Sequence, residues 1–407
     1  MENCKRIFTI FLVGWTSVGL GLQKAWTVKM GMSSDANLFS PFNLGGFGEI
    51  KNRIALASLT RGRSDNGVPT DLMAEHYCQR VSAGLLLAEA TGISPTSTGF
   101  NRTPYIYSAE HVEGWKKVTQ KVHENDGKIA LQLWHMGRAV HPDFINGELP
   151  VSASAERLED EHYVPDGSKK TGVTPRPLKV EEMPKIVDEY KLAAKNAIKA
   201  GFDGVEIHSA NGYLLDQFLQ SKTNKRTDEY GGSVEKRFRL LGEVIEGVLE
   251  ECPADRVGIK LSPNGVFNGM GSEDYVETFS YVLEKVAGYE LSYVQVMDGL
   301  AFGFHELGDP FTLKMVKNCI EKVQGKERKT AIMGNCGYTK ETAEKAITEG
   351  DADLISFGRP FIGNPDLVER FKSGAELVQE RMEDWYTLPS SDPADDAEGY
   401  TTYLPMN

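Results

Sequence analysis

Short apolar runs alternate with amphipathic stretches along the chain from Asn37 onward. Several runs are continuous apolar strings, such as LLLAEA and IALQLW, which is typical of parallel strands buried on both faces of a sheet. The stretches between the runs repeat their apolar positions with the period of an α-helix. The predicted strands are Arg53–Leu59, Leu85–Ala90, Lys128–Trp134, Asp203–His208, Arg256–Leu261, Tyr293–Met297, Thr330–Met333 and Asp353–Phe357.

The helical stretches carry recognisable start and stop signals. Asp71–Ala83 stops at Gly84 and Val180–Ala200 stops at Gly201, and a glycine there suits a left-handed residue just past a helix. Ser272 precedes two acidic residues, so we expect its hydroxyl to cap the helix that follows. The other predicted helices are Glu110–Asn125, Ser233–Glu251, Pro310–Gln324 and Thr339–Glu349.

Strands that alternate with helices indicate βα repeats, and eight such strands are the number that closes a parallel barrel. A doubly wound open sheet stays an alternative, because counting strands does not distinguish the two. We expect Leu38–Asn52 to form a hairpin that closes the barrel bottom. The Pro- and Gly-rich insertion His141–Leu178 is expected to cover the mouth as a lid. The acidic tail past Met382 shows no core pattern.

The sequence therefore predicts an α/β protein in which residues 38–407 form a single (β/α)8 TIM barrel domain. Its length of 407 residues, 40% of them hydrophobic, supports a large core. The net charge of -13 argues against nucleic acid as a partner. The cysteines form no CxxC pair, which argues against a disulfide framework, a zinc site and an iron–sulfur cluster. They are Cys4, Cys78, Cys252, Cys319 and Cys336.

Residues 1–37 differ from the rest of the chain and are interpreted as a leader. Lys5 and Arg6 precede an apolar run, Ile7–Leu22, that is short for a membrane span and typical of a signal-peptide core. The pattern of small residues around Ala25 is a poor cleavage site. A targeting segment, an uncleaved anchor and a misassigned start before Met32 stay open. A membrane is a partner only if the leader is kept as an anchor, and the compartment, cytoplasmic or organellar, depends on the same choice.

Polar side chains gather where the predicted strands end. In a barrel these positions share the C-terminal mouth, which is where barrel enzymes carry their active sites. One such residue would be an ordinary hydrogen-bonding group, whereas several on one face indicate a site without naming its reaction. They are Thr60, Gln132, His208, Asn211, Lys260, Asn335 and Arg359.

Each of the last two predicted strands is followed by a glycine and then a polar residue, a combination that favours phosphate binding. Gly334–Asn335 and Gly358–Arg359 lie in the two loops that form the usual phosphate site of these barrels. Glycine permits close approach, and arginine offers bidentate donors. For Arg359 alone, a surface ion pair is the alternative. No GxGxxG fingerprint follows a strand, which is consistent with a nicotinamide that visits rather than resides.

Six motifs in order resemble the old yellow enzyme family. The central one, GFDGVEIHSANGYLLDQFLQSKTNKRTDEYGGSVEKR, occupies Gly201–Arg237. The others are LFSPFNLGGFGEIKNRIALASLTRGRS, IALQLWHMGR, RVGIKLSPNGVFNGM, GNCGYTKETAEKAI and GDADLISFGRPFIGNPDLVERFKSG. The resemblance extends from about Leu38 to Tyr403. It implies an FMN-dependent ene-reductase that takes hydride from NAD(P)H and reduces the C=C bond of α,β-unsaturated carbonyl compounds by a ping-pong mechanism.

The resemblance also implies catalytic roles. His208 and Asn211 lie three residues apart and, if the chain turns helically there, share a face. Two donors on one carbonyl oxygen would polarise an enone, and the family uses a His/Asn pair in this way. Tyr213 is implied to protonate the α carbon. A satisfied polar pair and a packed tyrosine are the alternatives. The related 12-oxophytodienoate reductases usually carry histidine where Asn211 stands, which argues against an oxylipin-specific enzyme.

The implied cofactor is non-covalently bound FMN. The resemblance assigns its ring to Thr60, Gln132, Ala90 and Lys260, and its phosphate to Gly334, Asn335, Gly358 and Arg359. Trp134 and Tyr386 resemble the family's substrate-pocket aromatics, with Trp385 as the alternative in register. The chain departs from the family pattern in three places. Lys260 stands where arginine is usual, Ser58 replaces a common proline, and the tail EGYTTYLP differs from the usual family ending EGYTDYP.

Three other function classes stay open. One is a different flavin barrel, such as a dihydroorotate oxidoreductase or a dienoyl-CoA reductase with an iron–sulfur cluster. Another is a flavin-free sugar-phosphate isomerase or aldolase, because a fold does not fix a function. The third is a flavin-binding sensor without catalysis. The expected partner is a small enone or enal substrate. The chain is expected to be a monomer or a homodimer.

Overall fold

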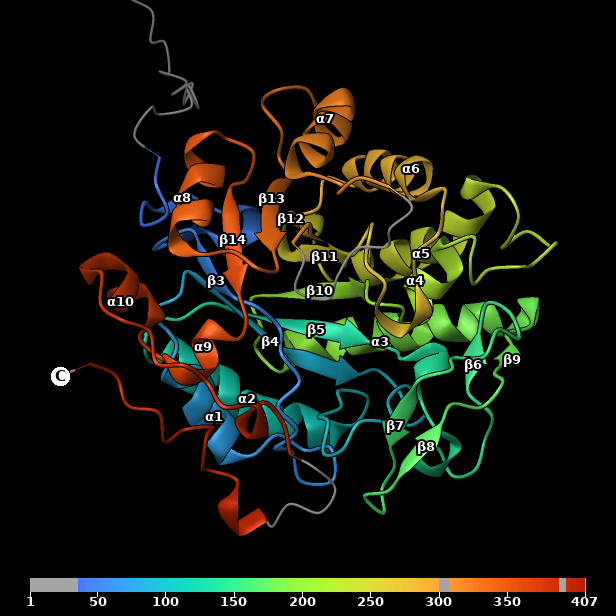
Figure 1. Cartoon of the computed structure of the whole chain (residues 1–407), viewed down its shortest axis with the longest axis horizontal. Helices are drawn as coiled ribbons and strands as arrows, with labels where there is room; N and C mark the ends of the chain where they lie inside the picture. Colours follow the sequence, from blue (N-terminus) through green and yellow to red (C-terminus); the bar gives the residue numbers. More distant parts are fainter. Residues whose placement is uncertain (1–35, 300–307, 388–392, 407) are drawn as a thin grey trace, which may run out of the picture. The chain divides into compact units, whose positions relative to one another are not determined.

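Eight parallel strands close into a barrel in the computed structural model, which describes residues 36–299, 308–387 and 393–406. The strands neighbour one another in the order β10-β11-β12-β13-β14-β3-β4-β5 (Figure 1). Their bounds are β3 (Ile54–Leu56), β4 (Leu85–Gly92), β5 (Ile129–Trp134), β10 (Gly204–Ser209), β11 (Val257–Leu261), β12 (Tyr293–Met297), β13 (Ala331–Asn335) and β14 (Leu354–Phe357). The predicted barrel is confirmed, and the open doubly wound sheet is excluded.

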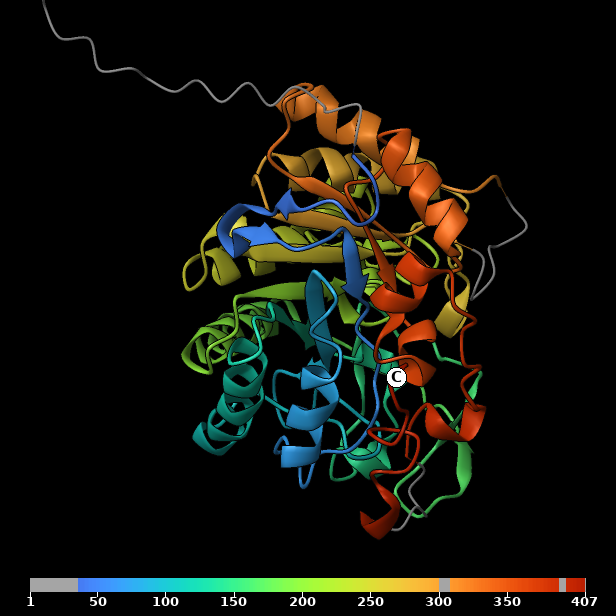
Figure 2. The same cartoon turned by 90° about the vertical axis from the view of Figure 1, so that its left-hand side faces the viewer.

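Helices surround the strands (Figures 1 and 2). Apolar strand residues that point outward, such as Val205 and Ile207 of β10, belong to the large core shared with these helices. Trp115 of α2 is fully buried there. The helices are α1 (Asp71–Cys78), α2 (Ala109–His123), α3 (Met183–Lys199), α4 (Leu214–Leu219), α5 (Val234–Leu249), α6 (Tyr275–Ala287), α7 (Leu313–Gln324), α8 (Lys340–Thr348), α9 (Pro360–Gly363) and α10 (Leu367–Ser373).

A second, smaller core fills the barrel and its bottom. The predicted hairpin forms as β1 (Phe42–Asn43) and β2 (Glu49–Ile50), which pair antiparallel. Phe47, between the two strands, is buried beside Tyr293 of β12, with ring centroids 6.3 Å apart. The hairpin therefore closes one end of the barrel, and the catalytic groups are left to the other end.

The predicted insertion also forms. It holds the short strands β6 (Val151–Ser152), β7 (Glu161–Tyr163), β8 (Lys169–Thr171) and β9 (Arg176–Pro177). These strands pair as two separate small sheets, β6 with β9 and β7 with β8. The insertion reaches the mouth through Leu158, which belongs to the same buried cluster as Trp134.

Two predicted helix signals have other roles. Gly84 does not take a left-handed conformation, and α1 already ends at Cys78. A side chain at Gly84 would instead meet the backbone of Asn52, because a Cβ there would lie 2.1 Å from its carbonyl oxygen. Ser272 is not the cap of α6, whose N-cap is Asp274; its hydroxyl bonds the Gln220 side chain at 3.2 Å. Of the two glycines predicted to end helices, Gly201, with φ +91, has the expected left-handed backbone and Gly84 does not.

The acidic tail, in which the sequence shows no core pattern, nevertheless contributes to the core. Tyr400 is completely buried, and its ring stacks on that of His76 of α1 with centroids 4.0 Å apart. The guanidinium groups of Arg61 and Arg63 lie 5.0 and 4.7 Å from the centroid of the Tyr400 ring. A single buried aromatic in an acidic segment leaves no periodic pattern, so this anchor was invisible in the sequence.

Within the described ranges, no helix is both long enough and apolar enough to cross a membrane. The apolar run Ile7–Leu22 and nearly all of the predicted leader lie outside those ranges.

Candidate active site

Three rings meet at the mouth of the barrel. Trp134 ends β5, His208 lies near the end of β10, and Tyr213 follows β10 after a short turn. The His208 and Tyr213 rings are 5.0 Å apart edge to face, and the Trp134 ring is 5.0 Å from that of Tyr213 and 6.4 Å from that of His208. Alternate residues of a strand share a face, so Gln132 lies below Trp134 and Glu206 lies below His208, inside the barrel.

His208 is electrically neutral at physiological pH. Its side chain is buried, and in the strand register it lies opposite Lys260 of β11. Burial, and then the charge of Lys260, hold the pKa of His208 well below its usual range. The imidazole can therefore act as a neutral N–H donor. Among the described residues, neither Nδ1 of His208 nor Nε1 of Trp134 has a hydrogen-bond partner, so two buried polar atoms at the mouth are left for a ligand.

The turn after β10 is not helical, contrary to the expectation for His208 and Asn211. Asn211 takes a left-handed backbone with φ +58, and Gly212 follows with φ +70. The Asn211 amide N–H donates to Oγ of Ser262 at 2.7 Å, and the Gly212 N–H donates to Oδ2 of Asp216 at 2.8 Å. These bonds hold the turn from two sides and set the position from which Tyr213 starts α4.

Tyr213 is half-buried and packs against the mouth cluster that contains Ala90 and Trp134. Burial raises the pKa of Tyr213 to about 12, and hydrogen bonding from the side chain of Asn268 opposes that shift. The phenol is therefore fully protonated at neutral pH and is a proton donor rather than a base.

A buried polar layer lies one step deeper in the barrel. The Gln132 amide donates to Oε1 of Glu206 at 2.6 Å, and the Ser58 hydroxyl donates to Oε1 of Gln132 at 2.9 Å. Lys260 is buried beside Glu206: burial lowers the pKa of Lys260, and the Glu206 charge opposes this. Burial raises the pKa of Glu206, and the Lys260 charge opposes this in turn. Because isolated charges are costly inside a protein, each of the two charges partly offsets the cost of burying the other.

The sequence predicts Gly334 and Asn335 in the loop after the seventh strand, but they are the last two residues of β13 itself. Asn335 pairs with Ser356 of β14, so the ends of the two strands that are predicted to hold phosphate are adjacent. The Asn335 side-chain amide donates to the Ser356 hydroxyl at 2.8 Å, so this side chain is already bonded within the sheet. Arg359 lies beside the tail, with its guanidinium 4.2 Å from the centroid of the Trp385 ring.

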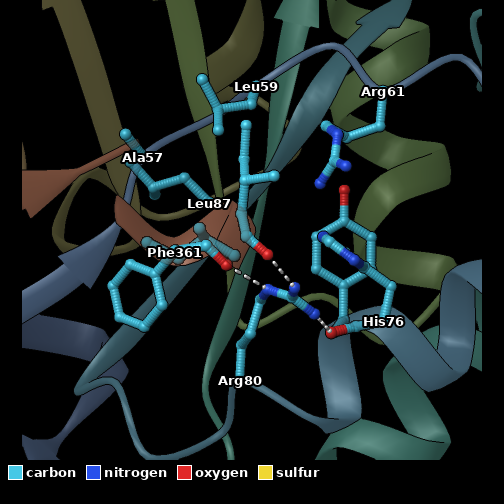
Figure 3. A pocket seen from close by; sticks show the side chains of 10 residues that line it. Ala57, Leu59, Arg61, His76, Arg80, Leu87 and Phe361 are labelled. Atoms are coloured by element: carbon cyan, nitrogen blue, oxygen red, sulfur yellow. Dashed lines mark hydrogen bonds between the residues drawn. The ribbon is translucent and has the colours of Figure 1, made fainter. Parts of the chain in front are cut away.

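Arg80, from the turn after α1, fixes the short helix that follows Arg359. Its guanidinium donates to the carbonyl oxygens of Phe361 at 2.9 Å, Ile362 at 3.1 Å and His76 at 2.8 Å (Figure 3). Burial lowers the pKa of Arg80 to about 9. This buried arginine bonds two backbone oxygens of α9, and it therefore holds α9, and with it Arg359, in place.

The tail brings one aromatic to each end of the site. Trp385 stacks on Arg359, whereas Tyr386 meets Phe100 edge to face with ring centroids 5.2 Å apart. Phe100 in turn packs against the mouth cluster around Trp134. The structure therefore brings Tyr386, not Trp385, to the aromatic mouth. Of the remaining predicted residues, Thr60 lies half-buried in the loop after β3, and Ala90 lies buried in β4.

Comparison with known proteins shows which family has this arrangement. The family model described as NADH:flavin oxidoreductase / NADH oxidase family matches residues 37–377. The chain is 40% identical to 12-oxophytodienoate reductase 7 of Oryza sativa subsp. japonica, over 90% of this chain and 94% of the relative. It is 38% identical to flavin oxidoreductase hxnT of Emericella nidulans, over 90% of this chain and 97% of the relative. The chain belongs to the old yellow enzyme family.

Solved structures agree with this. The old yellow enzyme homologue from Zymomonas mobilis superposes with a TM-score of 0.83 at 41% identity, covering 91% of this chain and 100% of the other. Morphinone reductase in complex with tetrahydroNAD superposes with a TM-score of 0.82 at 36% identity, covering 92% of this chain and 98% of the other. The protein is thus a flavin oxidoreductase, with FMN as its cofactor and a nicotinamide nucleotide as its reductant.

The donor groups of this old yellow enzyme family member fit FMN. Lys260 and the Gln132 amide supply a cation and a donor inside the barrel, and Arg359 supplies a second cation beside the β13 and β14 loops. A flavin needs donors at its pyrimidine edge and positive charge at its phosphate. The unpartnered nitrogens of His208 and Trp134 lie at the same mouth.

The sequence did not single out Glu206 or Asn268. Glu206 could have been found, because it lies two residues before His208 and so on the same face of a strand. Asn268 could not, because it lies in the loop after β11 and meets the turn at Asn211 only through the fold.

Arg359→Ala is expected to weaken FMN binding roughly 10- to 100-fold, the usual cost of losing hydrogen bonds to a charged group. Titration of the apoprotein with FMN, followed by flavin fluorescence, measures this. Riboflavin, which lacks the phosphate, should bind the variant and the native protein about equally. Arg239→Ala, an exposed arginine on α5, is the control. An equal loss of riboflavin and FMN affinity would contradict a phosphate role for Arg359.

Proposed function

We propose that the protein is an ene-reductase, which takes hydride from NAD(P)H and reduces the C=C bond of α,β-unsaturated carbonyl compounds by a ping-pong mechanism in one site. The observation that supports this most strongly is the pairing of a neutral donor with a protonated phenol. His208 and Tyr213 face each other with ring centroids 5.0 Å apart, beside the indole of Trp134. A carbonyl acceptor and a nearby carbon that gains a proton need these two groups.

FMN would be held along the mouth by the residues that the family pattern assigns. Thr60, Gln132, Lys260 and the backbone of Ala90 would hold its ring. Its phosphate would bind Arg359 and the backbone of Gly334, Asn335 and Gly358. When bound, FMN supplies the hydride chemistry in both half-reactions.

His208 and Asn211 would bind the substrate carbonyl oxygen. Because the pKa of His208 is held below its usual range, the imidazole donates an N–H without itself being charged. Donors placed in advance stabilise the negative charge that grows on that oxygen. Tyr213 would then give its proton to the α carbon, and Trp134 and Tyr386 would enclose the substrate and exclude water.

Lys260 keeps a positive charge where the family usually has arginine. An ammonium is a point charge without the planar fork of a guanidinium. Its attraction to Glu206 and Glu206's bond to Gln132 tie it to the same layer as the ring-binding amide. We therefore infer that FMN binding is retained and that the reduction potential of the flavin is altered.

Separate half-reactions test the proposal. The FMN-loaded protein is reduced anaerobically with NADPH and then mixed with 2-cyclohexenone while the flavin absorbance is followed. Rapid reoxidation with formation of cyclohexanone supports an ene-reductase. Reduction without reoxidation by the enone contradicts it and leaves another flavin oxidoreductase or a sensor. Failure to bind FMN would leave the flavin-free barrel enzymes.

An oxylipin reductase is the second candidate, because relatives at 40% identity are named 12-oxophytodienoate reductase. Asn211 in place of the histidine usual in that branch argues for a broader enone specificity. Comparing kcat/KM for 12-oxophytodienoic acid with that for 2-cyclohexenone decides between them. A preference of more than about 100-fold for the oxylipin, near 3 kcal/mol, would favour the specific enzyme.

A further inference from the structure

Asn268 joins the loop after β11 to the turn that carries Tyr213. It is buried and lies in a short 3-10 segment, Phe267–Gly269, with a left-handed backbone at φ +54. Its Nδ2 donates to the carbonyl oxygen of Asn211 at 2.8 Å. A carbonyl oxygen only accepts, so the group that faces it must be the NH2 end of the Asn268 amide.

The contact is close and fixed on both sides. A Cβ built on Gly212 would lie 2.7 Å from Cβ of Asn268, so only glycine lets the two segments meet at this distance. On the other side, Nη2 of Arg138 donates to the Asn268 carbonyl oxygen at 3.0 Å, and its Nη1 donates to that of Glu156 at 2.9 Å. Asn268 is therefore held between the insertion and the catalytic turn.

The amide of Asn268 has a second N–H besides the one given to Asn211. Hydrogen bonding from the Asn268 side chain lowers the pKa of the Tyr213 phenol, against the effect of burial. A donor near a phenol oxygen has this effect because it stabilises the charged form. The bond to the Asn211 carbonyl oxygen, two residues before Tyr213, is the contact by which the amide fixes the turn that carries the phenol.

We propose that Asn268 is a positioning residue for proton transfer, whose amide fixes the turn from which the Tyr213 hydroxyl reaches the mouth. This rests on the proposed function. In that step the O–H bond of Tyr213 breaks, and a C–H bond forms at the α carbon with the electron pair of the enolate. The phenol oxygen keeps its bonding pair as a phenolate and recovers a proton from water.

Two substitutions remove the side-chain donor of Asn268 while keeping the left-handed backbone at this position. Asn268→Gly keeps the left-handed conformation and removes the donor, and Asn268→Asp keeps the shape and replaces the donor with a carboxylate. Asn146→Gly is the matched control, because Asn146 is exposed on the insertion with φ +56. All three are loaded with FMN, reduced with NADPH and reoxidised with 2-cyclohexenone or with ferricyanide, which needs no proton donor.

We expect reoxidation by the enone to slow roughly 10- to 100-fold in Asn268→Gly and further in Asn268→Asp. Reduction by NADPH and reoxidation by ferricyanide stay within about twofold of native, because neither uses the phenol. In a Tyr213→Phe background the same changes at Asn268 should have no further effect, since the two residues act as one unit. Equal slowing of both oxidants, or additive losses, would overturn the proposal.

A measurement independent of turnover keeps this inference separate from the proposed function. With 13C at Cζ of tyrosine, the Tyr213 resonance is assigned by its loss in Tyr213→Phe. It should move in Asn268→Gly and Asn268→Asp and stay in Asn146→Gly. If the Tyr213 resonance moves but the native protein does not reduce enones, the positioning role of Asn268 is supported and the ene-reductase proposal fails. An unmoved resonance would overturn the role of Asn268.

Discussion

Tyr213→Phe is expected to slow reoxidation of the reduced protein by 2-cyclohexenone by about 10²–10⁴-fold, the usual contribution of a positioned general acid. Reduction of the same variant by NADPH should proceed within about twofold of the native rate, because hydride transfer into the flavin involves no proton from this phenol. Phenylalanine keeps the ring contacts with Trp134 and His208, so the mouth should keep its shape.

Stopped-flow absorbance of the flavin under anaerobic conditions measures both rates for Tyr213→Phe. Tyr163→Phe, an exposed tyrosine of the insertion, is the control and should match native protein in both half-reactions. Native-like reoxidation of Tyr213→Phe by the enone would remove Tyr213 from the role of proton donor. Slowing of both half-reactions would instead mean that the ring supports the flavin.

His208→Leu is expected to lower kcat/KM for the enone by about 10²–10³-fold, the cost of removing one donor from a developing oxyanion. Leucine fills much of the same space without an N–H. Steady-state rates with 2-cyclohexenone measure the loss, and His123→Leu, at the opposite end of the barrel, is the control. Unchanged kcat/KM would show that His208 does not bind the carbonyl.

The pH dependence of the native protein follows from the same residue. The pKa of His208 lies well below its usual range, because of burial and the Lys260 charge. The imidazole is neutral at every pH above that lowered pKa, so its titration should leave kcat/KM flat between about pH 6 and 8. A loss of activity with a midpoint near pH 6.5 that disappears in His208→Leu would mean that the charged imidazole is not excluded after all.

The barrel and the strand-end residues could be predicted because their signals are local. Apolar runs fix the strands, and period-two alternation places Gln132 with Trp134 and His208 with Glu206. Strand pairing then puts His208 opposite Lys260. These relations need only the order and register of neighbouring strands, which the βα pattern supplies.

The features that escaped prediction depend on contacts between distant segments. Tyr400 stacks on His76 from the far end of the chain, and Asn268 reaches Asn211 from the loop after the neighbouring strand β11. The left-handed turn at Asn211 replaces the expected helical turn because Ser262 and Asp216 bond its amides. No periodic pattern records such contacts, and a lone asparagine or tyrosine in a loop reads as an ordinary polar or surface residue.

Isotope transfer tests the central claim most directly. The protein is turned over anaerobically with NADPH deuterated at both C4 positions and an excess of 2-cyclohexenone, and the product is examined by mass spectrometry and NMR. The proposed chemistry predicts cyclohexanone with deuterium at C3, the former β carbon. Deuterium at the carbonyl carbon of an allylic alcohol, or a saturated ketone without deuterium at C3, would contradict it.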